Sequence, residues 1–141
     1  VARTDTPIIF VPGGMDFILY NGTNQIPEEK KERPFYKHNE IHTHVRANYD
    51  EMKTAGMFVA GRLAIMEHAV VMIPKRGYSQ RNCKGQIIYD PAADQGFTEA
   101  ARLGGLDVRE VDAHINDEKF AEQVMGVFTE IMGQLQVEEV S

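Results

Sequence analysis

The segment Pro7–Asp16 reads Pro-Ile-Ile-Phe-Val-Pro-Gly-Gly-Met-Asp, a short apolar run that ends abruptly at proline and glycine. An apolar run of this length, bounded in this way, is typical of a strand buried on both faces. Ala69–Ser79 has the same organisation, with Ala-Val-Val-Met-Ile-Pro followed by Lys-Arg-Gly-Tyr-Ser. Because strands buried on both faces occur in parallel sheets, we predict such a sheet, with a cleft at its carboxyl edge.

Three predicted strands alternate with helices along the chain. We place them at Pro7–Val11, Ala69–Ile73 and Val108–Val111, and expect them to be parallel neighbours in one sheet. Alternating strands and helices require right-handed crossovers, which put helices on the faces of the sheet. The predicted fold class is therefore α/β: a three-layer sandwich with a mainly parallel sheet, as in a Rossmann-like half-domain.

Capping residues mark the first two helices. Asn48-Tyr49-Asp50-Glu51 has the spacing of a capping box, which predicts a helix over roughly Tyr49–Met66. Asp90-Pro91 has a capping carboxylate followed by a proline suited to the first turn, and Gly104-Gly105 is a typical helix end. Between Tyr20 and Asn48 the chain is irregular, with short extended segments expected at 35–38 and 41–46.

The last helix is predicted to follow a cap at Asn116 or Asp117. Its apolar residues recur at spacings of three or four, as in one face of an amphipathic helix. They are Phe120, Val124, Phe128, Ile131 and Leu135. On this pattern we expect Phe128 and Ile131 to be core residues.

The composition limits the class of protein. The chain has 141 residues, a hydrophobic content of 43% and a formal net charge of -6. We interpret residues 1–141 as a single domain that binds neither nucleic acid nor membrane, since no basic stripe and no long apolar run is present. The single cysteine, Cys83, excludes an internal disulfide and favours a reducing, cytoplasmic compartment. Because a buried strand starts after six residues without an initiator Met, we expect a fragment of a longer, two-lobed protein.

Polar residues at the predicted strand ends are the candidate ligand-binding residues. Lysine, arginine and a hydroxyl beside glycine can bind phosphate or carboxylate groups through charge-assisted hydrogen bonds. The candidates are Gly13, Gly14, Asp16, Arg46, Lys75, Arg76, Gly77, Ser79, His114 and Asn116. The alternatives are a solvated basic turn at Lys75–Ser79, a tight turn at Gly13-Gly14 and a helix cap with a packed histidine at His114. The catalytic residues stay unknown, because no serine or cysteine has an evident base beside it.

A histidine cluster is the one candidate metal site. His38, His42 and His44 lie within seven residues, and His42-x-His44 would place two imidazoles on one strand face. The alternative is a set of surface histidines. Because a fourth ligand and a cysteine pair are missing, we expect no tight structural metal.

Five short motifs in order resemble a known family. They are Val11-Pro12-Gly13-Gly14-Met15-Asp16, Tyr36-Lys37-His38-Asn39, Thr43-x-x-Arg46, Asp90-Pro91-Ala92-Ala93-Asp94 and His114-Ile115-Asn116-Asp117-x-x-Phe120-Ala121. Over about Pro7 to Met132 the chain resembles the carboxyl-terminal part of the uncharacterised family of the tomato mosaic virus resistance protein. The resemblance implies two Rossmann-like halves, of which this chain is the later. The family is labelled an ATP-binding domain, so the resemblance implies ATP as a candidate cofactor, although no cofactor motif is evident in the residues themselves.

Two functional hypotheses follow. The first is an α/β domain that binds a nucleotide or another small anion at the carboxyl edge of its sheet. The alternative is a structural or oligomerisation module with no ligand of its own. We also expect a homo-oligomer, because Pro7–Val11 is strongly apolar and the amino-terminal half that would cover it is missing. Small residues of the first helix would allow close packing with a partner: Ala55, Gly56, Ala60 and Gly61.

Overall fold

A computed structural model describes residues 6–140 of the chain. The central sheet contains β1 (Ile8–Phe10), β5 (Ala69–Pro74) and β6 (Asp107–Val111), in the order β1-β5-β6. Both neighbouring pairs are parallel, with Ile9 opposite Val70 and Met72 opposite Arg109. The prediction of three parallel neighbouring strands is therefore confirmed.

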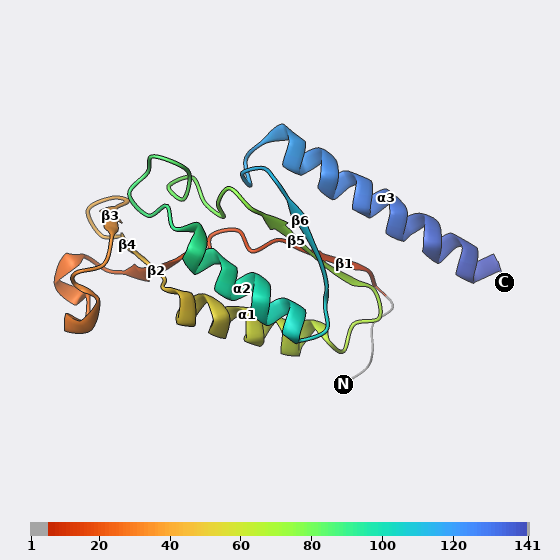
Figure 1. Ribbon diagram of the computed structural model, residues 1–141, viewed down its shortest axis with the longest axis horizontal. Coiled ribbons are helices and arrows are strands. Elements are labelled where there is room, and N and C mark those ends of the chain that lie inside the picture. The colour runs from red at the N-terminus through yellow and green to blue at the C-terminus, as the bar shows by residue number, and fades with distance from the viewer. Residues whose placement is uncertain (1–5, 141) are drawn as a thin grey trace.

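Helices cover both faces of this sheet, which gives the predicted three-layer α/β fold (Figure 1). α1 (Tyr49–Leu63) and α2 (Pro91–Leu103) lie on one face, and α3 (Glu118–Val140) lies on the other. Both faces of the sheet must be covered, because the apolar residues of β5 point alternately to the two helical layers. Val71 and Ile73 belong to the cluster beneath α1 and α2, whereas Val70 and Met72 pack with residues of α3.

The predicted caps are present. The Asn48 side chain accepts a hydrogen bond from the Glu51 backbone N–H, and the Glu51 carboxylate accepts one from the Asn48 N–H. The Asp90 carboxylate accepts from the Ala93 N–H at 3.0 Å, and Gly104 follows the last residue of α2. The first helix ends at Leu63, three residues before the predicted Met66.

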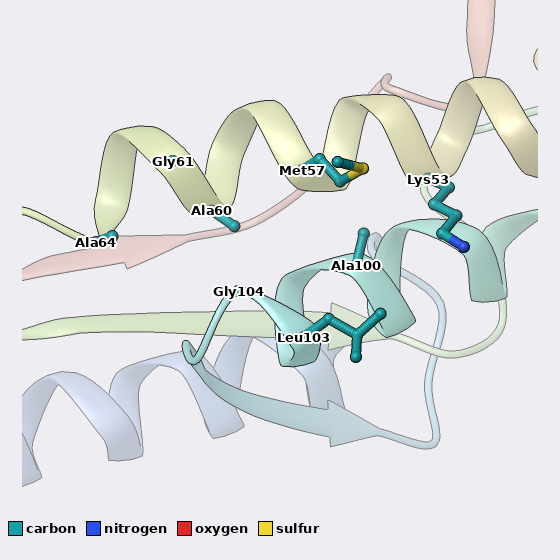
Figure 2. Close-up of a pocket in the computed structure, with 8 residues that line it drawn as sticks. All are labelled: Lys53, Met57, Ala60, Gly61, Ala64, Ala100, Leu103 and Gly104. Atoms are coloured by element: carbon teal, nitrogen blue, oxygen red, sulfur yellow. The ribbon is translucent and has the colours of Figure 1, made fainter.

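α1 and α2 pack with their backbones in close approach, side by side along an outer groove (Figure 2). A Cβ atom on Gly56 would lie 2.6 Å from the Phe97 carbonyl oxygen, and one on Gly96 would lie 2.3 Å from the Tyr49 carbonyl oxygen. Gly56 therefore serves packing within the chain and not packing with a partner. No atom lies within 4 Å of a Cβ built on Gly61, which faces outward into the groove.

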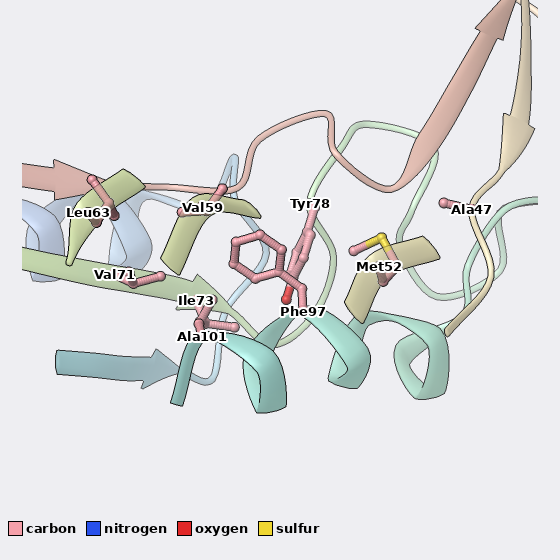
Figure 3. Close-up of a cluster of buried hydrophobic side chains, with 9 residues drawn as sticks. All are labelled: Ala47, Met52, Val59, Leu63, Val71, Ile73, Tyr78, Phe97 and Ala101. Atoms are coloured by element: carbon pink, nitrogen blue, oxygen red, sulfur yellow. The ribbon is translucent and has the colours of Figure 1, made fainter. Parts of the chain in front are cut away.

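The largest core cluster lies between the sheet and the α1–α2 layer (Figure 3). Phe97 is fully buried at its centre; its ring stacks on Phe10 with centroids 6.1 Å apart and meets the Tyr78 ring edge-on at 6.2 Å. The cluster comprises Ala47, Met52, Val59, Leu63, Val71, Ile73, Tyr78, Phe97 and Ala101.

α3 packs on the sheet largely through the predicted face, and the prediction of Ile131 as a core residue is confirmed. Phe120, Val127 and Ile131 are buried, but Phe128 is 47% exposed, so its prediction as a core residue is wrong. The reason is geometric: positions four apart drift around a helix of 3.6 residues per turn, whereas positions seven apart stay on one face. Val127, seven residues after Phe120, occupies the place that the pattern gave to Phe128.

The irregular excursion contains a second, antiparallel sheet. It is formed by β2 (Phe17–Tyr20), β4 (Thr43–Arg46) and β3 (Phe35–Lys37), in the order β2-β4-β3. Phe17 is opposite Arg46, and the Ala47 N–H donates to the Asp16 carbonyl oxygen at 3.0 Å. This small sheet therefore holds Arg46 against the loop that leaves β1.

Candidate functional site

The loops that leave β1, β5 and β6 meet at the carboxyl edge of the central sheet. The Gly14 N–H donates to the Tyr78 carbonyl oxygen at 2.9 Å, which joins the first loop to the second. The Ile115 N–H donates to the Gly77 carbonyl oxygen at 3.2 Å, which joins the third loop to the second. The edge therefore brings together nine of the ten candidate residues from the strand ends, and Arg46 reaches it from β4.

Gly77 has a conformation that the second loop requires. Its φ is 129°, and a Cβ atom there would lie 1.5 Å from the Asn82 carbonyl oxygen. A side chain is therefore excluded by strain and by collision. The turn allows the loop to reverse direction immediately after Arg76 and to bring Tyr78 into the core.

Ser79 lies between two of the candidate residues. Its hydroxyl donates to an Asp16 carboxylate oxygen at 2.6 Å, and its carbonyl oxygen accepts from His114 Nε2 at 2.9 Å. The Asn116 N–H donates to His114 Nδ1 at 3.2 Å, so this histidine carries its proton on Nε2. His114 bonds to the backbone of Ser79 and not to its hydroxyl, so the arrangement is not that of a nucleophile with its base.

The glycines of the first loop use their amides within the protein. The Gly13 N–H donates to the Val11 carbonyl oxygen at 2.8 Å, and the Gly14 N–H donates to Tyr78. A Cβ atom on Gly13 would lie 3.0 Å from the end of the Ile115 side chain. The two glycines therefore allow the loops to approach closely, and their amides are not directed at a ligand.

Arg46 forms the centre of a buried ionic cluster behind the loops. It is 3% exposed and donates through Nη1 to the Asp16 carbonyl oxygen at 2.7 Å. Through Nη2 it donates to the Asp90 carbonyl oxygen at 2.7 Å and to the Asp94 carboxylate at 2.5 Å. Asn82 donates to the other Asp94 oxygen at 2.8 Å. Arg46 thus connects β4, the first loop and α2. Its positive charge is balanced by carboxylates of the protein itself.

The cluster contains more negative than positive charge. Asp16 is fully buried, and its carboxylate lies 4.0 Å from Arg46 Nη1, so one guanidinium faces two carboxylates. Burial raises the pKa of Asp94, and Arg46 and Asn82 act against that increase. Removing one partner from such a cluster leaves an uncompensated buried charge, so its hydrogen bonds couple the first loop to β4 and α2.

A cleft of about 690 Å³ lies on the solvent side of these loops. The residues that line it are Lys75, Arg76, Cys83, Lys84, Tyr89, Asp112 and His114. Lys75, Arg76 and Lys84 contribute three positive charges and Asp112 contributes one negative charge, so the lining has a net charge of about +2. In a chain with a formal net charge of -6, this edge of the sheet is locally cationic.

Arg76 is paired with Asp112 across the end of the cleft. Its Nε and Nη2 donate to the two Asp112 carboxylate oxygens at 2.9 and 2.8 Å. This bidentate pair lowers the pKa of Asp112, and both side chains are exposed. The lysines lining the cleft, Lys75 and Lys84, have no ion pair of this kind among the described residues.

Lys84 and Tyr89 are cleft residues that the sequence reasoning missed. Both lie in the long loop between β5 and α2, where no periodic pattern indicates which side chains turn inward. The available signal was their position, since loops that follow strands of a parallel sheet line its carboxyl edge.

The histidine cluster belongs to the small sheet and its edge, and His38, His42 and His44 are not among the residues that line the cleft. The His44 ring is stacked on Phe17 at 3.9 Å and on His38 at 5.1 Å, and its Nδ1 is hydrogen-bonded to the Tyr36 hydroxyl at 2.6 Å. His42 lies one residue before β4, so of the two histidines only His44 belongs to the strand. Burial lowers the pKa of His44, and the nearby His38 and His42 act in the same direction. Among the side chains of residues 6–137 no cluster of three metal-ligating groups is found.

Residues 1–132 match the family model described as "Uncharacterised protein family (UPF0261) C-terminal domain". The chain belongs to this family. This match confirms the family resemblance that the five sequence motifs indicated.

Curated relatives agree with the family assignment. A UPF0261 protein of Rhizobium meliloti (strain 1021) is 30% identical over 93% of this chain and 34% of its own length. A UPF0261 protein of Mesorhizobium japonicum is 31% identical over 88% of this chain and 33% of its own length. The ToMV resistance protein Tm-1(GCR237) of Solanum lycopersicum is 28% identical over 89% of this chain and 17% of its own length. The chain therefore spans about a third or less of these relatives.

None of the described helices combines the length and the hydrophobicity needed to cross a bilayer.

Proposed function

We propose that this domain binds a small anionic ligand, a nucleotide or another phosphorylated compound, in the cleft at the carboxyl edge of its parallel sheet. The observation that carries the proposal is the cationic lining of that cleft by Lys75, Arg76 and Lys84. Ligands of open α/β sheets bind outside the carboxyl ends of the strands, which is where these side chains lie. The name of the plant relative mentions no ligand, so the proposal rests on the residues that line the cleft.

The roles of the lining residues follow from their chemistry. Lys75 and Lys84 would bind anionic oxygens directly, because their ammonium groups have no carboxylate partner comparable to that of Arg76. The half-buried Tyr89 ring offers an apolar face to a base or another flat group. His114, with its proton on Nε2 bonded to Ser79, would position the loop and not contact the charge.

Arg76 would exchange partners when the anion binds. Its guanidinium is held by Asp112, and a phosphate group offers the same bidentate geometry. In the absence of ligand Asp112 therefore competes with the anion for Arg76. A carboxylate at this position weakens anion binding while it stabilises the empty cleft.

This competition gives opposite expectations for two substitutions. Lys84→Gln removes a charge-assisted hydrogen bond worth about 1.5–3 kcal/mol, so the Kd for ATP or inorganic phosphate should rise about tenfold or more. Asp112→Asn releases Arg76 from an exposed ion pair worth ~0.2–1 kcal/mol, so the Kd should fall by up to about fivefold. Isothermal titration calorimetry with ATP, ADP and inorganic phosphate measures both.

Lys37→Gln is the matched control, because Lys37 is an exposed lysine on β3 that does not line the cleft. It changes the net charge as Lys84→Gln does, and its Kd should equal that of the unsubstituted chain. If Lys37→Gln and Lys84→Gln weaken anion binding equally, the effect comes from the overall charge of the chain and not from the cleft. A Kd unchanged by Lys84→Gln would contradict the proposed site.

A further inference from the structure

The outer surface of the α1–α2 layer has an exposed apolar groove. It has a volume of about 420 Å³, and its lining residues are Lys53, Met57, Ala60, Gly61, Ala64, Ala100, Leu103 and Gly104. Small residues form its floor, and two large side chains stand beside it: Met57 is 61% exposed and Leu103 is 81% exposed. Figure 2 shows Lys53 extending from α1 towards α2 at one end. We call this surface the α1–α2 groove.

α3 has an apolar surface of its own that the chain leaves uncovered. Met125, Phe128 and Met132 are spaced three and four apart and are 59%, 47% and 37% exposed. This spacing places them on one side of the helix, next to the face that packs on the sheet. We call these three residues the α3 stripe. Together, the groove and the stripe account for most of the exposed large apolar side chains on the described helices.

One chain cannot bring these two surfaces together. α1 and α2 lie on one face of the central sheet and α3 lies on the opposite face, so the sheet separates them (Figure 1). The two surfaces are complementary in charge. Lys53 is the one charged residue among the described residues that line the groove, while Glu118 and Glu122 precede the stripe within one or two turns of α3.

We propose that the α3 stripe of one copy of this chain packs into the α1–α2 groove of a second copy. Met125, Phe128 and Met132 would fill the space above Gly61 and Ala64, and the glutamates at the start of α3 would approach Lys53. An amphipathic helix in an apolar groove is an established mode of protein recognition, with anchors at spacings of three and four. The proposal concerns a surface remote from the anion cleft and is independent of the proposed ligand.

A head-to-tail contact is favoured over a two-fold contact between two grooves. The two-fold arrangement would bring the two Lys53 side chains into the same interface and would leave both α3 stripes exposed. The head-to-tail arrangement covers both surfaces with one type of contact. Contacts of this kind repeat from copy to copy, so they produce a closed ring or a chain of subunits, and the assembly should grow with concentration.

Two substitutions remove one surface each without disturbing the fold. Gly61→Glu adds a carboxylate to the groove at a position where no atom lies within 4 Å of the new Cβ. Met125→Glu places a charge in the stripe at a side chain that is already 59% exposed. Gln123→Glu is the control, because it adds the same charge to α3 at an exposed position outside the stripe.

Sedimentation velocity at tens of micromolar measures the assembly. The unsubstituted chain and Gln123→Glu should sediment as oligomers, and each of the other two variants should sediment as the 15.9 kDa monomer. An equimolar mixture of Gly61→Glu and Met125→Glu should form a dimer, because it retains one intact stripe and one intact groove. A monomeric unsubstituted chain, a single variant that remains oligomeric, or a mixture that stays monomeric would overturn the proposal. Circular dichroism of each variant verifies that its helices are intact.

Discussion

Replacing Arg46 by methionine is expected to lower the free energy of unfolding by about 3–5 kcal/mol, the usual cost of removing one partner from a buried ion pair. Arg46 is 3% exposed and bonds to the Asp94 carboxylate and to the carbonyl oxygens of Asp16 and Asp90. Methionine is similar in length and apolar, so it keeps most of the packing. The loss therefore comes mainly from leaving Asp16 and Asp94 buried without a cation. Urea unfolding at neutral pH measures it.

The cost should depend on pH in a defined direction. Burial raises the pKa of Asp94 above its unfolded value of 3.8, and Arg46 opposes that increase. Without Arg46 the folded protein binds a proton more readily than the unfolded chain, so its stability falls as pH rises through the raised pKa. The difference between Arg46→Met and the unsubstituted chain should therefore shrink as the pH is lowered towards 4.

Arg46→Lys is the matched control for this prediction. Lysine keeps the positive charge but cannot donate to Asp16, Asp90 and Asp94 at the same time, because it lacks the planar guanidinium. Its loss of stability should lie between zero and that of Arg46→Met. A loss below about 1 kcal/mol for Arg46→Met would show that the cluster is accessible to water and does not hold the loops.

Phe97→Ala is expected to lower the free energy of unfolding by about 3–5 kcal/mol, because it empties the centre of the core between the sheet and the α1–α2 layer. Phe97 is fully buried and contacts the rings of Phe10 and Tyr78. The close approach of the α1 and α2 backbones at Gly56 and Gly96 limits how far the structure can relax into the cavity. Urea unfolding again provides the measurement.

Phe128→Ala supplies the comparison, since it removes the same side chain from a position that is 47% exposed. Measured at a concentration at which the chain is monomeric, its effect should be below about 1 kcal/mol, as for most exposed positions. If the two phenylalanine variants lose equal stability, the orientation of α3 described above is wrong. A small loss at Phe97 alone would mean that the α1–α2 layer repacks freely.

The fold could be predicted because its signals are local. Asn48 and Glu51, three residues apart, form the capping box that they predict, and Asp90 caps the helix that Pro91 starts. Apolar runs bounded by proline and glycine identified β1 and β5, and the third predicted strand, Val108–Val111, lies within β6. The small antiparallel sheet was only partly anticipated, because β2 reads Phe-Ile-Leu-Tyr and has no alternation between polar and apolar residues.

The candidate site was harder to predict because its contacts are between residues far apart in the chain. Arg46 pairs with Asp94, 48 positions away, and its backbone bond to Asp16 spans 30 positions. No local pattern distinguishes an arginine that binds a ligand from one that neutralises a buried carboxylate. Arg76, in contrast, lies at a strand end, where the topology alone directs it to the edge of the sheet.

Alkylation of Cys83 tests the binding of an anion in the cleft most directly. Cys83 is the one cysteine of the chain and lines the cleft beside Lys84, so its reaction rate with iodoacetamide reports on that space. We predict that ATP or inorganic phosphate slows the reaction in a saturable manner, and that Lys84→Gln raises the concentration needed for half-maximal protection. A rate that stays the same at millimolar ATP, ADP and phosphate would contradict the account.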